Sequence, residues 1–164
     1  MISENQFKQG MRQLASAVNV ITVDHAGRRD GLTATAACSV SAEPPQLLIC
    51  VNRDALAHDL IEGAGAFCLN ILGKDQEDVA MRFAGLDGAD RADRYGLGSW
   101  TTLETGAPVL EGTLVSFDCK IAQQIAAGTH SIFIGEIVAA TEIRDGRPLM
   151  YGEGQFTTLE SVAN

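Results

Sequence analysis

The alternation of apolar and polar residues predicts that most of this chain is β-strand. Residues 115–121 show it most clearly, because every second side chain is apolar, as in a strand with one buried face. Largely apolar runs at 18–23, 46–51 and 67–72 predict further strands, and the Leu-Leu-Ile-Cys-Val stretch within 46–51 predicts a buried one. The first half of 131–143 is also apolar on both faces, so a strand there needs cover from the core and from either a helix or a second subunit.

Helical spacing of apolar residues is confined to three stretches. In 3–18 the apolar residues recur at helical intervals after a capping-box pattern formed by Ser3 and Gln6. Residues 54–62 and 75–83 are the other two candidate helices. Many strands joined by short turns, with few helices between them, favour an antiparallel barrel or sandwich over a parallel βαβ sheet.

Three further segments complete the predicted layout. Residues 31–41 are small, uncharged and rich in hydroxyls, and Glu43-Pro44-Pro45 ends the run. Residues 85–99 are rich in Gly, Asp and Arg and show no period, which predicts a long functional or mobile loop. Two short strands around 149–151 and 155–157 close the chain.

Length and charge narrow the possible functions. The 164 residues suit a single domain, 1–164, and the net charge of −9 argues against a nucleic-acid partner. No apolar run approaches the roughly 20 residues that span a bilayer, and the N-terminus carries no secretory signal, so we expect a cytoplasmic protein with no membrane partner. The phosphate of a small ligand would have to be met locally, by Arg53, Lys74 or Arg82 or by backbone amides.

The four cysteines indicate no metal site. Cys38, Cys50, Cys68 and Cys119 form no Cys-x-x-Cys pair and lie in apolar or strand-like contexts, so we expect reduced, buried thiols. The glycine-rich motifs of Rossmann and P-loop proteins are absent. The carboxylates Asp87, Asp90 and Asp93 are expected to be solvated loop charges.

Residues 33–41 contain the first candidate chemistry. Four hydroxyls lie at nearly alternate positions, on Thr33, Thr35, Ser39 and Ser41. Hydroxyl and backbone groups on such a strand suit the polar edge of a heteroaromatic ring and a phosphate. The same composition also suits a strand of small residues packed against a neighbouring sheet or helix, and the residues alone leave both readings open.

A series of motifs runs along nearly the whole chain in a fixed order. They are Gly31–Ser41, Pro44-Pro45, Leu48–Asn52, Phe67–Leu72, Arg82-Phe83-Ala84-Gly85, Gly106–Leu110, Gly128-Thr129-His130, Gly135-Glu136-Ile137 and Pro148-Leu149-Met150-Tyr151. In order and spacing they resemble the flavin-reductase-like family, the FMN-binding split barrels.

The resemblance implies a mainly β fold, an antiparallel Greek-key split barrel with a few flanking helices. It also implies a homodimer with flavin at or near the dimer interface. Members similar to this chain are the small reductase components of two-component monooxygenases. They pass a hydride from NADH or NADPH to FMN or FAD, and the reduced flavin diffuses to the partner oxygenase.

The resemblance also implies, by position, which residues meet the flavin. The isoalloxazine edge and ribityl chain would contact Thr33, Ala34, Thr35, Ala36, Ser39, Val40 and Ser41, with backbone contacts from Cys50, Val51 and Asn52. Arg82 and Phe83 would meet the flavin phosphate and the adjacent chain, with Arg82 as a solvated charge the alternative. Ala57 and His58 would add a phosphate contact, unless His58 is an exposed helix residue.

His130 is the main catalytic candidate. In the family a Gly-Asp-His triplet seats the nicotinamide nucleotide, and here Gly128 and His130 flank Thr129 in place of the acid. A strand-end histidine bonded to backbone is the alternative for His130. Tyr151 either lines the nicotinamide pocket or fills the mouth of the barrel.

Two other functions stay open at this point. The missing acid motivates a non-catalytic flavin-binding or electron-carrier protein. Similar folds also reduce other acceptors, such as corrinoid cobalt.

Overall fold

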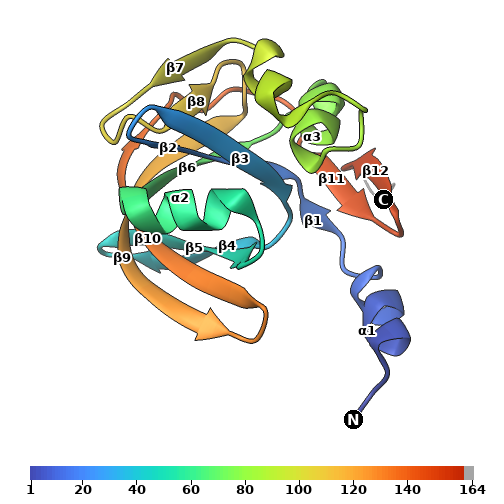
Figure 1. Cartoon of the computed structure of the whole chain (residues 1–164). Helices are drawn as coiled ribbons and strands as arrows, with labels where there is room; N and C mark the ends of the chain where they lie inside the picture. The colour runs from blue at the N-terminus through green and yellow to red at the C-terminus, as the bar shows by residue number, and fades with distance from the viewer. Residues whose placement is uncertain (161–164) are drawn as a thin grey trace.

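The structure is a computed structural model that describes residues 1–160, and its main element is a seven-stranded antiparallel sheet. The strand order is β3–β2–β6–β9–β10–β5–β4 (Figure 1). The strands are β2 (Asn19–His25), β3 (Arg28–Ala34), β4 (Ala37–Ala42), β5 (Pro45–Asn52), β6 (Ala66–Ile71), β9 (Val115–Ala127) and β10 (His130–Ala140). The predicted mainly β, antiparallel architecture is confirmed.

The order of these strands forces the sheet to curl. β3 and β4 are its two edges, yet only Thr35 and Ala36 separate them along the chain. The edges must therefore approach each other, which closes the sheet into a barrel. β3 pairs with β2 and β4 pairs with β5, and no ladder among residues 1–160 joins β3 to β4. We call this unpaired junction the seam.

Smaller elements surround the barrel, and the N-terminal helix projects away from it with no buried residue (Figure 1). They are α1 (Glu4–Met11), β1 (Ser16–Ala17), α2 (Leu56–Ala64), α3 (Glu77–Ala84), the 3₁₀-helix η1 (Arg91–Gly96), β7 (Trp100–Thr102), β8 (Pro108–Leu110), β11 (Leu149–Gly152) and β12 (Gln155–Thr158). α2 buries Ala57, Leu60 and Ile61 in the main core. α3 lies outside the barrel against β3, where the Thr33 hydroxyl donates to the Ala80 carbonyl over 2.6 Å. In the described range no helix has the length and apolar character to cross a membrane.

Two apolar clusters hold these layers together. The barrel interior is filled by the inward residues of the strands, with Phe67 and Phe133 fully buried. Gly135 allows this packing, since a Cβ there would lie 2.7 Å from the Phe67 ring. A second cluster joins the barrel to α3 and β11 through Phe83 and Leu149.

One buried amide ties four segments together inside the barrel wall. Asn70 on β6 is fully buried and donates to the Val20 carbonyl (3.0 Å) and the Thr22 hydroxyl (3.1 Å). Its carbonyl oxygen accepts from the Leu110 N–H (2.9 Å) and the Ser116 hydroxyl (2.8 Å). Because buried polar groups are costly when unpaired, this residue fixes β2, β8 and β9 relative to β6.

The elements differ from the sequence-based prediction in four places. The first helix ends at Met11 rather than at 18, because the chain turns into β1, which pairs with β11. Residues 31–41 are two strands broken at the seam. The predicted loop 85–99 contains η1, and β9 continues to Ala127.

The Asn70 network predicts a large loss of stability. Asn70→Ala leaves several buried partners unpaired and should lower the free energy of unfolding by about 3 kcal/mol, measured by urea denaturation. Asn5→Ala, on exposed α1, is the control and should change it by less than about 0.5 kcal/mol. A loss at Asn70 no greater than at Asn5 would contradict this role for the network.

Candidate functional site

The seam leaves edge groups available to a ligand. Edge strands present backbone N–H and C=O groups that lack a strand partner. Thr35 and Ala36, which turn the chain from β3 into β4, are both exposed. Their side chains are small, so the backbone at the seam is open to a flat ligand.

Two adjoining depressions meet at the seam. One, of about 230 Å³, is lined by Thr33, Ala34, Thr35 and Tyr151 together with apolar Val18, Leu86 and Phe156. The other, of about 320 Å³, shares Thr35 and Tyr151 and is bounded by α1. Their joint size suits a cofactor-sized ligand. Thr33, Ala34, Thr35 and Tyr151, predicted from widely separated motifs, are thus brought together.

A second group of predicted residues lies at the open ends of β5 and β10. Asn52 is opposite His130 in the ladder between these strands, and both are exposed. The Cys50 N–H donates to the Ala36 carbonyl over 3.0 Å. Cys50 therefore links this group to the seam, and the two groups form one continuous band, the seam band, from Thr33 through Ala36 and Asn52 to His130.

The turn before β10 is held firmly, and it orients His130. The Thr129 hydroxyl lies 2.9 Å from Nδ1 of His130, which leaves Nε2 for a ligand. The Arg53 N–H donates to the Thr129 carbonyl over 3.0 Å, and the Arg53 guanidinium donates to the Gly128 carbonyl. Thr129 thus provides an uncharged contact to the imidazole at the position where the family's triplet has an acid. Arg53 is exposed and bonds to this turn through both its backbone and its side chain.

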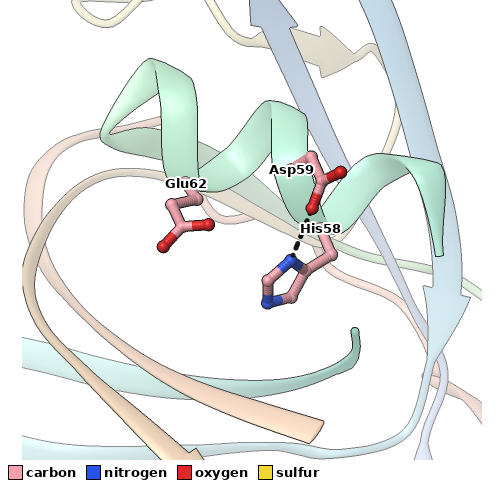
Figure 2. Close-up of side chains that lie close together, drawn as sticks. All are labelled: His58, Asp59 and Glu62. Atoms are coloured by element: carbon pink, nitrogen blue, oxygen red, sulfur yellow. Dashed lines mark hydrogen bonds and ion pairs between the residues drawn. The ribbon is translucent and has the colours of Figure 1, made fainter. Parts of the chain in front are cut away.

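Behind the turn, α2 contacts β10 through a buried histidine. His58 is 5% exposed, and its Nε2 lies 2.8 Å from the Ser131 hydroxyl. Its Nδ1 lies 3.1 Å from the Asp59 carboxylate, the contact drawn in Figure 2. This is the hydrogen-bond order of a hydrolase triad. Ser131 is only 2% exposed, so its hydroxyl cannot reach a substrate, and the three side chains fasten β10 to α2.

The same helix presents a cluster of possible metal ligands. Ligand atoms of His58, Asp59 and Glu62 lie within 4.8 Å of one another (Figure 2). Both ring nitrogens of His58 already have partners, and Gln124 donates to the Glu62 carboxylate over 3.1 Å. We therefore assign these side chains a structural role in holding the β9–β10 hairpin.

Comparison with known proteins identifies the family of this chain. The model of the flavin reductase like domain matches residues 11–160. This chain belongs to that family. It is 41% identical over 158 residues to a protein of Methylorubrum extorquens named FMN reductase (NADH) RutF 2, covering 96% of this chain and 91% of the relative.

Two solved flavin reductases share the fold. BorF, the flavin reductase component of a bacterial two-component tryptophan halogenase, matches with a TM-score of 0.87 and 31% identity over 98% of this chain and all of its own. The NADH:FAD oxidoreductase SgcE6 of Streptomyces globisporus, solved with NAD and FAD fragments, matches with a TM-score of 0.89 and 29% identity over 99% and 96%. The predicted family and the predicted activity, flavin reduction with nicotinamide and flavin nucleotides, are confirmed.

Several predicted contacts of this flavin reductase point into the core instead. The Phe83, Ala57 and Val51 side chains are at most 1% exposed, because each packs in an apolar cluster. The Phe83 side chain therefore faces the core, and contact of its backbone with flavin stays a prediction. Of the two alternatives for His58, exposure is wrong, and its ring nitrogens are already bonded within the protein.

Arg82 faces the loop that follows α3. Its Nε binds the Asp87 carboxylate and its Nη1 donates to the Asp93 carbonyl over 3.0 Å. The hydrogen bond from Arg82 lowers the pKa of Asp87, which is an exposed loop carboxylate paired with Arg82. Ser39, Val40 and Ser41 lie along the β4 edge. They continue the seam band along the second strand.

The structure also corrects the expectation for the cysteines. Cys68 and Cys119 are buried, but Cys38 is exposed on the edge strand β4. Burial, and then the charge of Asp118, raise the pKa of the buried thiols, that of Cys119 to about 12. Val18, Ala84 and Leu86 were not among the predicted residues. They line the seam depression of about 230 Å³, which we call the seam groove. Leu86 had a signal, as an isolated large apolar residue in a Gly- and Asp-rich loop.

The His58–Ser131 contact predicts energetic coupling. His58→Leu and Ser131→Ala should each lower the free energy of unfolding by about 1–2 kcal/mol, because each leaves a buried polar group unpaired. The double variant should lose less than the sum, with a coupling of about 1 kcal/mol in a urea-denaturation cycle. Strict additivity would show that the two side chains do not interact.

Proposed function

We propose that this protein transfers a hydride from NADH to FMN at the seam band and releases the reduced flavin to a partner monooxygenase. The single observation that carries the site assignment is the seam band itself. It places unpaired strand edges, small side chains and His130 along one continuous surface. The names FMN reductase (NADH) for a relative and two-component halogenase for BorF support the substrates and the diffusing product.

The residues of the seam fit a flavin. Its ring is flat, with a polar edge of nitrogen and carbonyl groups, and a strand edge offers N–H and C=O groups at matching intervals. Bound flavin supplies the hydride acceptor. Backbone donors from Thr35 to Ser39 would stabilise negative charge that builds on the ring edge, since preset donors cost no reorganisation during the reaction.

The remaining residues position the substrates. His130, oriented by Thr129, would contact the nicotinamide nucleotide through Nε2. Apolar Leu86, Tyr151 and Phe156 would limit water around the stacked rings, which favours a near-attack arrangement. A phosphate contact is proposed for the Nη2 of Arg82, the terminal nitrogen that neither Asp87 nor Asp93 occupies.

The alternative function, a non-catalytic flavin-binding or electron-carrier protein, is less well supported. It rested on Thr129 in place of an acid, and the Thr129 hydroxyl contacts the imidazole of His130. Cytoplasmic location is proposed because NADH is supplied there and because the cysteines of residues 1–160 are unpaired thiols.

Turnover of NADH with FMN tests the function and the role of His130 together. Wild-type protein should consume NADH, followed by its absorbance, only when flavin is added. His130→Ala should raise the KM for NADH or lower kcat by about tenfold, as expected for one lost hydrogen bond. The Kd of FMN, measured by fluorescence titration, should change less than about twofold.

His25→Ala is the matched control, because His25 is exposed at the turn between β2 and β3, away from the seam. It should leave turnover unchanged. Absence of NADH consumption with either flavin and either nucleotide would refute the function. Equal loss of FMN binding in His130→Ala would show that the histidine contacts flavin instead.

We further propose a homodimer through the outer face of β4, β5, β10 and β9. Inward residues of β10 are buried, so its alternate residues face outward. Across the strands these form two apolar rows, Cys38–Leu48–Ile134 and Cys50–Ile132–Ile125. Ile125 on β9 and Val40 on β4, at opposite sides of this face, are 40% and 44% exposed in the single chain. A second copy would cover this face, and it would place the interface beside His130 and Asn52.

Ile125→Glu tests the dimer without disturbing the core. A charge within this apolar interface should convert the dimer to monomer at micromolar concentration, observed by sedimentation velocity. Thr102→Glu, exposed on β7, is the control and should leave the dimer intact. A monomeric wild-type protein, or a dimeric Ile125→Glu variant, would refute this interface.

A further inference from the structure

A second cavity lies away from the seam depressions and is unusually basic. It has a volume of about 230 Å³ and lies between β3, α2 and η1. Three arginines line it, Arg28, Arg29 and Arg91, while Leu56 and Leu60 of α2 form an apolar wall. We call it the basic pocket.

The arginines around this pocket exceed the carboxylates that could neutralise them. Asp30 alone binds both Arg91 and Arg94, the latter over 3.1 Å. Neither Arg28 nor Arg29 forms an ion pair with any carboxylate of residues 1–160. This local positive excess stands out in a chain whose net charge is −9.

Neighbouring groups do not neutralise this excess of positive charge. Asp24 is opposite Arg29 in the ladder, but its carboxylate accepts from the Gly27 N–H over 2.8 Å. The Arg29 guanidinium lies over the Tyr95 ring, 4.8 Å from its centroid. Burial, and then the charge of Arg91, lower the pKa of Arg94, as expected where positive charges crowd together.

The first turn of α2 adds to the positive field. Leu56, which lines the pocket, is the first residue of this helix, and Ala55 before it provides no side-chain cap. The helix therefore begins beside the pocket with N–H groups that no side chain satisfies, and the positive end of its dipole lies there.

The pocket and the seam are joined by two segments. Along β3, Asp30 precedes Thr33 by three residues, about 10 Å of extended strand. After α3, the chain passes from Leu86 in the seam groove to Arg91 in the basic pocket. This spacing along β3 is shorter than an extended dinucleotide, whose two halves can therefore span residues of both cavities.

We propose that the basic pocket binds the adenosine diphosphate half that FAD, NADH and NADPH share and FMN lacks. Arg28, Arg29 and Arg91 would bind the pyrophosphate, and Leu56 and Leu60 would contact the adenosine. This assignment rests on the proposed function, because it takes the seam as the place where the flavin and nicotinamide rings meet. It adds to that function a subsite that recognises the adenylate of a dinucleotide substrate.

Calorimetric titration with ADP tests the subsite without turnover. Wild-type protein should bind ADP, and the double variant Arg28→Gln/Arg29→Gln should bind it about tenfold more weakly, because charge-assisted contacts are lost. The Kd of FMN should not change. Arg144→Gln, which removes an exposed charge paired with Asp75 elsewhere, is the control for general electrostatics.

Two further measurements identify the source of the adenylate. If the KM for NADH rises in the double variant while the affinities for FMN and FAD stay equal to wild type, the pocket serves the nicotinamide nucleotide. If FAD affinity falls while the KM for NADH with FMN is unchanged, it serves the flavin. Either result supports the subsite.

Three results would overturn the proposal: no ADP binding by wild-type protein, equal ADP binding by the double variant, or an equal loss in Arg144→Gln. Thermal unfolding of each variant checks that the fold is intact, which we expect because both arginines are exposed. Failure of the subsite with normal NADH–FMN turnover would leave the proposed function standing. ADP binding with no turnover would refute the function alone.

Discussion

The meeting of two sheet edges is the constraint on which the rest of the molecule depends. β3 and β4 follow each other in the chain with two residues between them, yet five other strands separate them in the sheet. The barrel can close only by bringing these edges together, and no ladder pairs them. Backbone groups that other barrels use for closure are therefore left for a ligand. A flat cofactor with a polar edge suits such a place.

Near this junction, polar contacts as well as apolar packing hold the turn before β10 in place. Arg53 bonds twice to the turn that carries His130, and His58 holds the next residue, Ser131, from inside the barrel. Hydride transfer requires reacting groups in a narrow range of positions and little else from the protein. Rigid placement is thus the contribution that the proposed function requires of these side chains.

Charge is distributed unevenly over an acidic chain. The segment after α3 is fastened at both ends by ion pairs, Arg82 with Asp87 and Arg91 with Asp30. It runs between the seam groove and the basic pocket. The two sites therefore share one wall, and a ligand that bridges them would contact the same fixed segment at both ends.

Local patterns determined much of this protein. Alternation over 115–121, the largely apolar runs and the turn residues predicted strands in the correct places, since burial of a strand face leaves a pattern of apolar residues in the sequence. Ordered motifs also predicted the family and the residues Thr33–Ala36, Asn52 and His130 that share one surface. Tertiary structure alone decided the rest. Thr35 and Ala36 form the seam because the strands they connect are opposite edges of the sheet. Phe83 and His58 are buried because α3 and α2 pack against the barrel. Asp30 binds two arginines from a segment about 60 residues away in the sequence. Such choices depend on which distant surfaces meet, and no local pattern of residues records them.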